Sequence, residues 1–248
     1  MIRLFRKIRH KLLSEQSYGI YILYASGEII LVVVGILLAL QIDTWSDNRK
    51  QEDQNLSYES LLAVDLVQDT LMISGQLRLL AHDTTQLSSY INSMSSEEVT
   101  IDTLIQIARF EFNPWIYASA TFNNNTFTSL RSTGDLNYFD PWLQKKLVAL
   151  NELHQDYYNS VQVDVGSYLD QATFYNQKYP FNDKGHINPS SKLSEDIWQS
   201  AGYVELGAYL NGLIAIKFVT ELDAINKLLV IREYTMGILE KLDIYDSN

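Results

Sequence analysis

The sequence contains no cysteine and few of the residues that interrupt helices. Without cysteine, no disulfide can form, and lipoprotein processing is argued against. Only 4 prolines and 11 glycines are spread over 248 residues, which favours long helices over a turn-rich β fold. Basic residues are also scarce, since 19 Lys and Arg face 30 Asp and Glu. The formal charge of −11 argues against nucleic acid as a partner, because phosphates repel an acidic surface.

Residues 18–42 form the one long apolar run, and Glu28 is its only charged side chain. A hydrocarbon core of about 30 Å requires roughly 20 apolar helical residues, so the run predicts one transmembrane helix. The alternative is a cleaved signal peptide, whose apolar region is usually about 7–15 residues long and ends in a small-x-small motif. This run is longer, and Gln41 stands where a small residue is needed. The run therefore predicts an uncleaved signal anchor.

The charges on the two sides of the run predict its orientation. Residues 1–17 are strongly basic, with Glu15 as their one acid, whereas the remainder of the chain is acidic. Basic flanks stay in the cytoplasm. We therefore expect a cytoplasmic segment at residues 1–17, one span at residues 18–42 in the bacterial inner membrane, and a periplasmic domain at residues 43–248.

The basic segment has a helical pattern of its own. Residues 2–13 place Phe5, Ile8 and Leu12 on one helical face and direct basic side chains elsewhere. This predicts a short amphipathic helix on the anionic inner leaflet, with membrane lipid as a partner. A basic, unstructured tail is the alternative.

Apolar residues at helical spacing follow the run in three stripes, which predict three long helices. The first stripe is Leu62, Leu66, Ile73, Leu77, Leu80, Leu87, Ile91 and Met94. The second is Leu143, Leu147, Leu150, His154, Tyr157, Val161, Val165, Tyr168, Ala172 and Tyr175. The third, in a helix from about Ser194 or Tyr203 to Leu242, is Leu210, Ile214, Phe218, Leu222, Ile225, Leu229, Met236 and Leu239.

Cap and stop residues predict the shorter elements. Asp102 is expected to cap a helix that ends at Asn113-Pro114. Gly134 is expected to close a short helix over TFTSLRST, and Asp140 to cap the second long helix. Because amphipathic helices cannot bury their stripes singly, the sequence predicts an all-α antiparallel bundle with no sheet. The bundle could form within one chain or in an oligomer that includes a coiled coil.

Three segments of the chain resemble an uncharacterised family of small, single-span envelope proteins of Gram-negative bacteria. They are MIRLFRKIRHKLLSE, YASGEIILVVVGILLALQIDTWSDNRK and TFTSLRSTGDLNYF. The resemblance implies an inner-membrane anchor followed by a helical periplasmic body. It implies no activity and no functional residue.

Glu28 is a candidate carboxylate within the membrane or at its interface. At the centre of a membrane helix such a group costs about 2.5–3.5 kcal/mol, so it would face protein or water and could bind a proton or a partner. Alternatively, the span starts near Ile29 and the helix dipole stabilises Glu28 at the inner interface. In both interpretations Glu28 shares a face with Gly35 and Ala39, where small residues permit close helix packing. This face is the candidate contact with a second copy or another membrane protein.

A second candidate is the loop formed by Phe122, Asn123, Asn124, Asn125 and Phe127. Aromatic rings beside adaptable amides are typical of recognition surfaces, so the loop could line a ligand or partner site. The alternative is a structural loop whose asparagines adopt left-handed conformations.

No catalytic or nucleotide-binding motif is found, and no histidine pair has metal-ligand spacing. His154 falls within an apolar stripe, which predicts a core histidine with one hydrogen-bonded ring nitrogen. We therefore expect no metal, no cofactor and no enzyme activity. The expected function is a non-catalytic scaffold or accessory subunit in protein assembly. A proton-coupled, stator-like subunit that uses Glu28 and a periplasmic ligand sensor are the alternatives.

Overall fold

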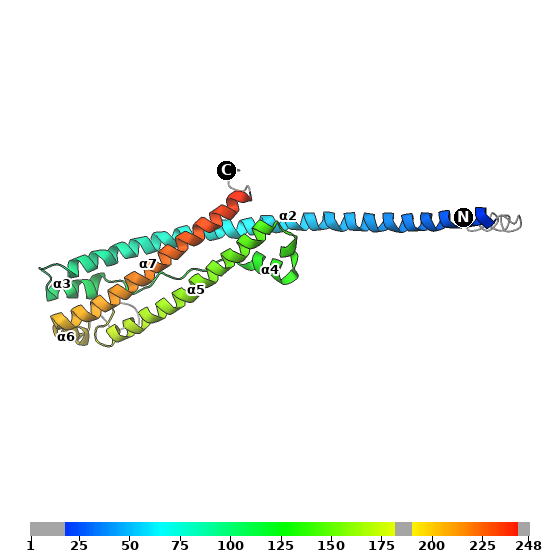
Figure 1. The fold of residues 1–248 in the computed structure, drawn as a ribbon. Helices are drawn as coiled ribbons and strands as arrows, with labels where there is room; N and C mark the ends of the chain where they lie inside the picture. Colours follow the sequence, from blue (N-terminus) through cyan, green and yellow to red (C-terminus); the bar gives the residue numbers. More distant parts are fainter. Residues whose placement is uncertain (1–17, 182–189, 243–248) are drawn as a thin grey trace. The chain divides into compact units, whose positions relative to one another are not determined.

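The structure, a computed structural model, describes residues 18–181 and 190–242. These residues are mostly helical and contain no strand, which confirms the predicted all-α fold. As Figure 1 shows, the elements are α2 (Tyr18–Met94), α3 (Ile101–Gln106), the π-helical turn η1 (Ile107–Glu111), α4 (Asn125–Thr133), the 3₁₀ turn η2 (Asp135–Tyr138), α5 (Pro141–Asn176), α6 (Lys192–Gln199) and α7 (Tyr203–Lys241). The amphipathic helix predicted over residues 2–13 lies outside the described residues.

The chain divides into two units, Met1–Ser57 and Tyr58–Asn248, and α2 contributes residues to both. In the first unit, residues 29–42 of α2 expose all their side chains, so that Leu31 is 74% exposed and Val34 is 47% exposed. Among the described residues, α2 is the one helix long and apolar enough to cross a membrane. It is therefore a candidate membrane span or signal anchor.

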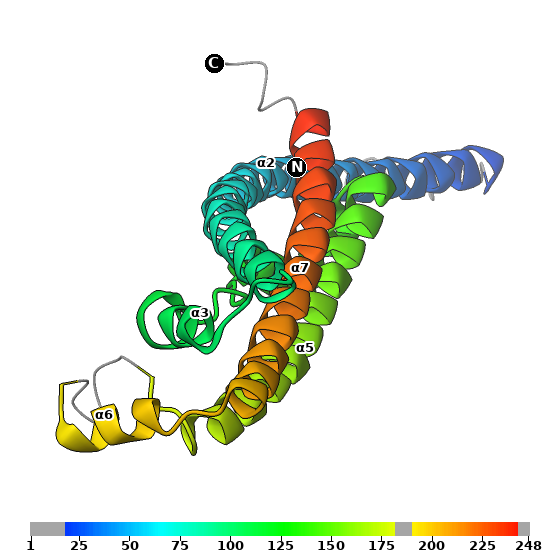
Figure 2. The same cartoon turned by 90° about the vertical axis from the view of Figure 1, so that its left-hand side faces the viewer.

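The second unit is a helical bundle. In Figure 1 and in Figure 2, α5 and α7 lie side by side and run antiparallel. The first predicted stripe is buried at Leu62, Leu66, Ile73, Leu80 and Leu87, and the second at Leu143, Leu147, Leu150, His154, Tyr157, Val161, Tyr168 and Tyr175. Both stripes belong to the core of a single chain. The α2 stripe is thus covered by the chain's own helices, and self-association requires another surface.

The third predicted stripe is correct in part. Leu210, Ile214 and Leu239 are buried, but Leu222, Leu229 and Met236 are 42%, 46% and 37% exposed. The buried face of α7 contains instead Leu206, Leu210, Leu213, Ile214, Lys217, Thr220, Glu221, Ala224, Leu228, Ile231, Thr235, Ile238 and Leu239. The prediction chose a neighbouring face of α7 because it avoided polar residues, whereas Lys217 and Glu221 on the observed face have partners inside the bundle.

Two of the three predicted caps are confirmed. Asp140 Oδ1 accepts from the backbone N–H of Trp142 at 2.9 Å at the start of α5. Gly134 closes α4 with a φ of 84°, in the left-handed region that favours glycine. The cap at Asp102 is wrong. Thr100 caps α3 instead, because its extended backbone lets the hydroxyl accept from the N–H of Thr103 at 3.3 Å.

Candidate functional site

Residues 112–124 connect η1 to α4 without regular secondary structure, and we call this segment the strap. Ala118, in its middle, is fully buried. A buried segment outside helices and sheets needs other partners for its backbone donors and acceptors. Side chains of α2, α5 and α7 provide those partners, so the strap is held by three helices.

Two tyrosines of α5 donate hydrogen bonds to the strap. The Tyr168 hydroxyl donates to the Pro114 carbonyl O at 2.6 Å, and the Tyr157 hydroxyl donates to the Ala118 carbonyl O at 2.5 Å. Both rings are buried, and burial raises the pKa of each phenol above its usual value of 10. Both therefore stay neutral donors near neutral pH.

Asp83 of α2 and Lys217 and Glu221 of α7 form a cluster that we call the buried charged cluster. Lys217 Nζ lies 2.6 Å from Asp83 Oδ2 and donates to the carbonyl O of Asn113 at 2.7 Å. Glu221 Oε1 accepts from the backbone N–H of Tyr117 at 3.3 Å. Lys217 and Glu221 are 0% exposed and Asp83 is 4% exposed. The cluster thus ties two residues of the strap to α7, and its ion pair joins α7 to α2.

Charge balance in the buried charged cluster requires a proton. Two carboxyl groups face one ammonium group, so full ionisation would leave a buried negative charge without a partner. Burial, followed by the charge of Asp83 and a hydrogen bond to it, raises the pKa of Glu221 from 4.5 to about 8. Glu221 is therefore the protonated partner near neutral pH. The rings of Phe112 and Tyr117, with centroids 5.4 and 5.8 Å from Lys217 Nζ, further stabilise the ammonium group.

The loop predicted as a recognition site packs against α2 and α5. Asn123 donates to Asp69 Oδ1 from its backbone N–H and from its side-chain amide, each at 2.8 Å. Asn124 Oδ1 lies 3.1 Å from Nδ1 of His154, and the Phe122 ring stacks on the His154 ring with centroids 4.0 Å apart. These contacts place three of the five loop residues against the bundle.

The other two residues differ in their surroundings. Phe127 is buried in the core, whereas Asn125 is the exposed first residue of α4. A left-handed backbone does not describe Asn124, whose φ is −108°. The recognition role of this loop stays a prediction.

His154 is confirmed as a core histidine, with 3% of its surface exposed. Burial lowers its pKa to about 4, so the ring is neutral and its Nδ1–H can donate to the Asn124 oxygen. Its other ring nitrogen has no hydrogen-bond partner among the described residues. Burial also raises the pKa of Asp69, to about 6. Both pKa shifts have the same cause, which is that the side chains of His154 and Asp69 beside the strap are shielded from water.

Glu28, Gly35 and Ala39 share a face of α2 in the first unit, and all three are exposed. A Cβ added at Gly35 would meet no described atom within 4 Å. The face is therefore open in a single chain, and its role in helix packing stays a prediction.

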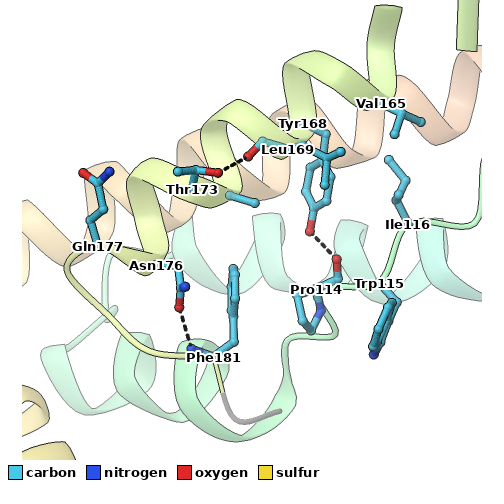
Figure 3. A pocket seen from close by; sticks show the side chains of 11 residues that line it. Pro114, Trp115, Ile116, Val165, Tyr168, Leu169, Thr173, Asn176, Gln177 and Phe181 are labelled. Carbon is cyan, nitrogen blue, oxygen red and sulfur yellow. Dashed lines mark hydrogen bonds between the residues drawn. The ribbon is translucent and has the colours of Figure 1, made fainter. Parts of the chain in front are cut away.

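An apolar pocket lies between the strap and α5. Its volume is about 550 Å³, and Figure 3 shows the hydrogen bond from Tyr168 to Pro114 crossing from one wall to the other. The strap contributes residues 114–116, and the remaining wall consists of Val165, Tyr168, Leu169, Ala172, Thr173, Asn176, Gln177 and Phe181. None of the described residues that line it is Asp, Glu, Lys, Arg or His.

The sequence analysis missed both the buried charged cluster and the pocket. A signal for the cluster exists, because Asp69, Gln76 and Asp83 fall in the gaps of the first stripe, at the same alternating spacing of three and four. Polar residues in phase with a buried stripe mark positions that need an internal partner. The pocket has no such signal, since the strap that forms one wall carries no periodic pattern.

A long apolar helix followed by a helical bundle, in which a buried charged cluster binds a central strap, defines a helical protein with one candidate membrane span in the part of the chain that the structure describes. The chain belongs to DUF6090, a family of unknown function whose family model matches residues 28–179. The match agrees with the resemblance to an uncharacterised family and covers the strap and all of α5, but not α6 or α7. No curated protein and no solved structure matches the chain. Among the described residues, no three His, Asp or Glu side chains are grouped so that they could hold a metal ion.

Proposed function

We propose that this protein is a non-catalytic, membrane-anchored envelope protein that acts as a helical scaffold or accessory subunit in protein assembly. The observation that carries the proposal is the exposed apolar surface of residues 29–42 in α2. A Val, Leu or Ile side chain left in water forgoes roughly 1.5–3 kcal/mol of burial free energy. A helix with so many of them requires lipid or a protein partner around it.

The charge pattern supports one topology for this anchor. The basic residues 1–17 favour a cytoplasmic N-terminus at an anionic inner leaflet, and the acidic remainder favours export to the periplasm. A reporter that is active only in the periplasm, fused after Asn248, should therefore be active in cells. Activity of a cytoplasmic reporter at the same position would contradict the topology.

The exposed side of α7 supports self-assembly. Its outward positions follow alternating gaps of three and four residues and are Val219, Leu222, Asn226, Leu229, Glu233 and Met236. Val219, Asn226 and Glu233 share one heptad position, and Leu222, Leu229 and Met236 share the other. A β-branched residue and an asparagine opposite mostly leucine positions favour a parallel two-stranded contact. We propose a second copy of this chain as the occupant of this face.

Cysteine cross-linking tests the assembly, because the chain has no cysteine of its own. In a parallel dimer equivalent residues meet, so the variant Leu229→Cys should form a disulfide-linked dimer in membranes under mild oxidation. Val163→Cys, at a 69% exposed residue of α5, is the matched control and should remain mostly monomeric. Equal cross-linking of the two variants would contradict the α7 interface. Identification of the proteins that co-purify with the chain would show which other proteins belong to the assembly.

A further inference from the structure

We propose that the pocket between the strap and α5 is a binding site for the neutral, lipophilic part of a small molecule, such as one alkyl chain or two to three rings. The proposal is independent of the scaffold function. It rests on the size of the pocket, the chemistry of its lining and the way its wall is held.

The pocket is large enough for such a ligand. Its volume of about 550 Å³ falls within the range of about 300–1,000 Å³ that is typical of small-molecule sites. An apolar cavity of about 150 Å³ already binds benzene. The pocket therefore has room for several rings or for an extended chain.

The lining selects a neutral ligand. A charged group placed among these side chains would lose its hydration without gaining a partner of opposite charge. Two lining hydroxyls are already bonded, since Tyr168 donates to Pro114 and Thr173 donates to the Leu169 carbonyl O at 2.8 Å. The amides of Asn176 and Gln177 lie at one end of the pocket, where the Asn176 Oδ1 accepts from the backbone N–H of Phe181 at 3.3 Å (Figure 3). That end suits a hydroxyl or ester group of an otherwise apolar molecule.

Water now faces apolar surface that a ligand would cover. Trp115 is 63% exposed and Leu169 is 54% exposed, and they contribute to opposite walls (Figure 3). Phe181, which is 8% exposed, contributes a further apolar wall. Covering these side chains provides the free energy of binding, at about 25 cal/mol per Å² of apolar area.

The strap wall is held in position from both of its ends. Residues 114–116 line the pocket, and the residues that flank them are bonded to the buried charged cluster. Asn113 accepts from Lys217, and Tyr117 donates to Glu221. A wall that is already ordered adds little ordering entropy to the cost of binding. The cluster residues are therefore positioning residues for this pocket.

Photolabelling of the full-length chain in lipid nanodiscs tests the proposal. The probe is a long-chain alcohol that carries a diazirine on its alkyl chain, and the matched charged probe ends in a sulfate instead of the hydroxyl. Labelled positions are located by mass spectrometry. Both probes enter the bilayer, so labelling of residues 29–42 is the internal reference. Relative to it, the neutral probe should label residues 165–177 about tenfold more than the exposed side of α7, the ratio given by about 1.4 kcal/mol.

Two variants and a control assign the labelling to the pocket. Ala172→Trp fills the pocket and should abolish the excess labelling, and Leu169→Gln, at an already exposed position, should reduce it. Val163→Trp, on α5 but outside the lining, should leave the labelling unchanged. Circular dichroism establishes that each variant keeps its helix content.

Several outcomes would overturn the proposal. They are labelling spread evenly over the exposed apolar residues, equal labelling by the sulfate probe, and a response to Val163→Trp equal to that of Ala172→Trp. Mass analysis of a solvent extract of protein purified from native membranes then distinguishes a membrane lipid from another neutral molecule.

Discussion

The two units place apolar and charged side chains in opposite surroundings. In the first unit, residues 29–42 of α2 expose a nearly continuous apolar surface, whereas in the second unit Asp83, Lys217 and Glu221 are almost completely buried. Whether a side chain is apolar or charged therefore does not by itself decide whether it is buried. A charged side chain is buried where it has a partner of opposite charge and a strap backbone to bind, and an apolar side chain is exposed where the chain provides no partner for it.

The variant Lys217→Met should cause the largest loss in the free energy of unfolding. It leaves Asp83 without its counter-charge and Asn113 without its donor. Removing one member of a buried ion pair costs about 3–5 kcal/mol. Chemical denaturation of the full-length chain in mild detergent, followed by circular dichroism, should show that loss.

Lys227→Met is the matched control for this loss. Lys227 pairs with Asp223 one turn away on α7, and both side chains are partly exposed. The loss there should stay below about 1 kcal/mol, as for other surface ion pairs. Equal destabilisation by the two variants would show that the buried ion pair contributes no more to stability than the exposed one.

A lysine in the exposed apolar helix should have the next largest effect. Val34→Lys places a charge near the centre of the apolar helix and raises the free energy of inserting that helix into a membrane by about 2.5–3.5 kcal/mol. Carbonate extraction of membranes should release a larger share of this variant, while its thermal unfolding should be unchanged. Val148→Lys, at a 41% exposed residue of α5, should remain in the membrane fraction like the native chain.

The pH dependence of stability tests the shared proton of the buried charged cluster. Glu221 holds its proton up to about pH 8 in the folded chain and only up to about pH 4.5 in the unfolded chain. The folded state therefore binds more protons across this window, and the contribution of Glu221 to stability falls as pH rises through it. Glu221→Gln keeps an acceptor for Tyr117 and carries no titrating group, so this loss should disappear.

The measurement is the free energy of unfolding of both chains at several pH values. The advantage of Glu221→Gln should increase from pH 5 to pH 8 and reach roughly 1–3 kcal/mol. The raised pKa of Asp69 and the lowered pKa of His154 act in both chains and cancel in the difference. A constant difference across this range would contradict a protonated Glu221.

The smallest effect is expected where a neutral hydrogen bond holds the strap. Tyr168→Phe removes the donor to the Pro114 carbonyl and leaves that acceptor without its partner, at a cost of about 1 kcal/mol. Tyr158→Phe, at a 54% exposed ring of the same helix, should change the free energy of unfolding by much less. Denaturant midpoints of the two variants compare them directly.

Local sequence patterns predict much of the fold, but they do not predict which distant residues contact one another. The periodic stripes of α2 and α5, the Asp140 cap and the Gly134 terminus each depend on neighbouring residues, so the sequence alone predicts them. The buried face of α7 depends on Asp83 and the strap, more than a hundred residues earlier in the chain. From the sequence alone, Lys217 and Glu221 are therefore predicted to lie on the surface, because their partners are distant in the chain.

The candidate site was less predictable for the same reason. Phe122, Asn123 and Asn124 are notable in the sequence for their composition, but their contacts are with Asp69 and His154 on two different helices. Glu28 is conspicuous because it interrupts an apolar run, and a single chain supplies no partner for it. The pocket combines residues 114–116 with residues 165–177, and no local rule joins these segments.

The strap also constrains how the chain folds. Its bonds from Lys217 to Asn113 and from Tyr117 to Glu221 each span 104 positions in the sequence. Contacts of such long range slow folding, because a large loop must close before they form. The family match ends at residue 179, before either α7 partner is reached. A chain truncated there would lack Lys217 and Glu221, so Asp83, Asn113 and Tyr117 would each lose an α7 partner. We therefore expect the bundle to become complete only after α7 has been synthesised.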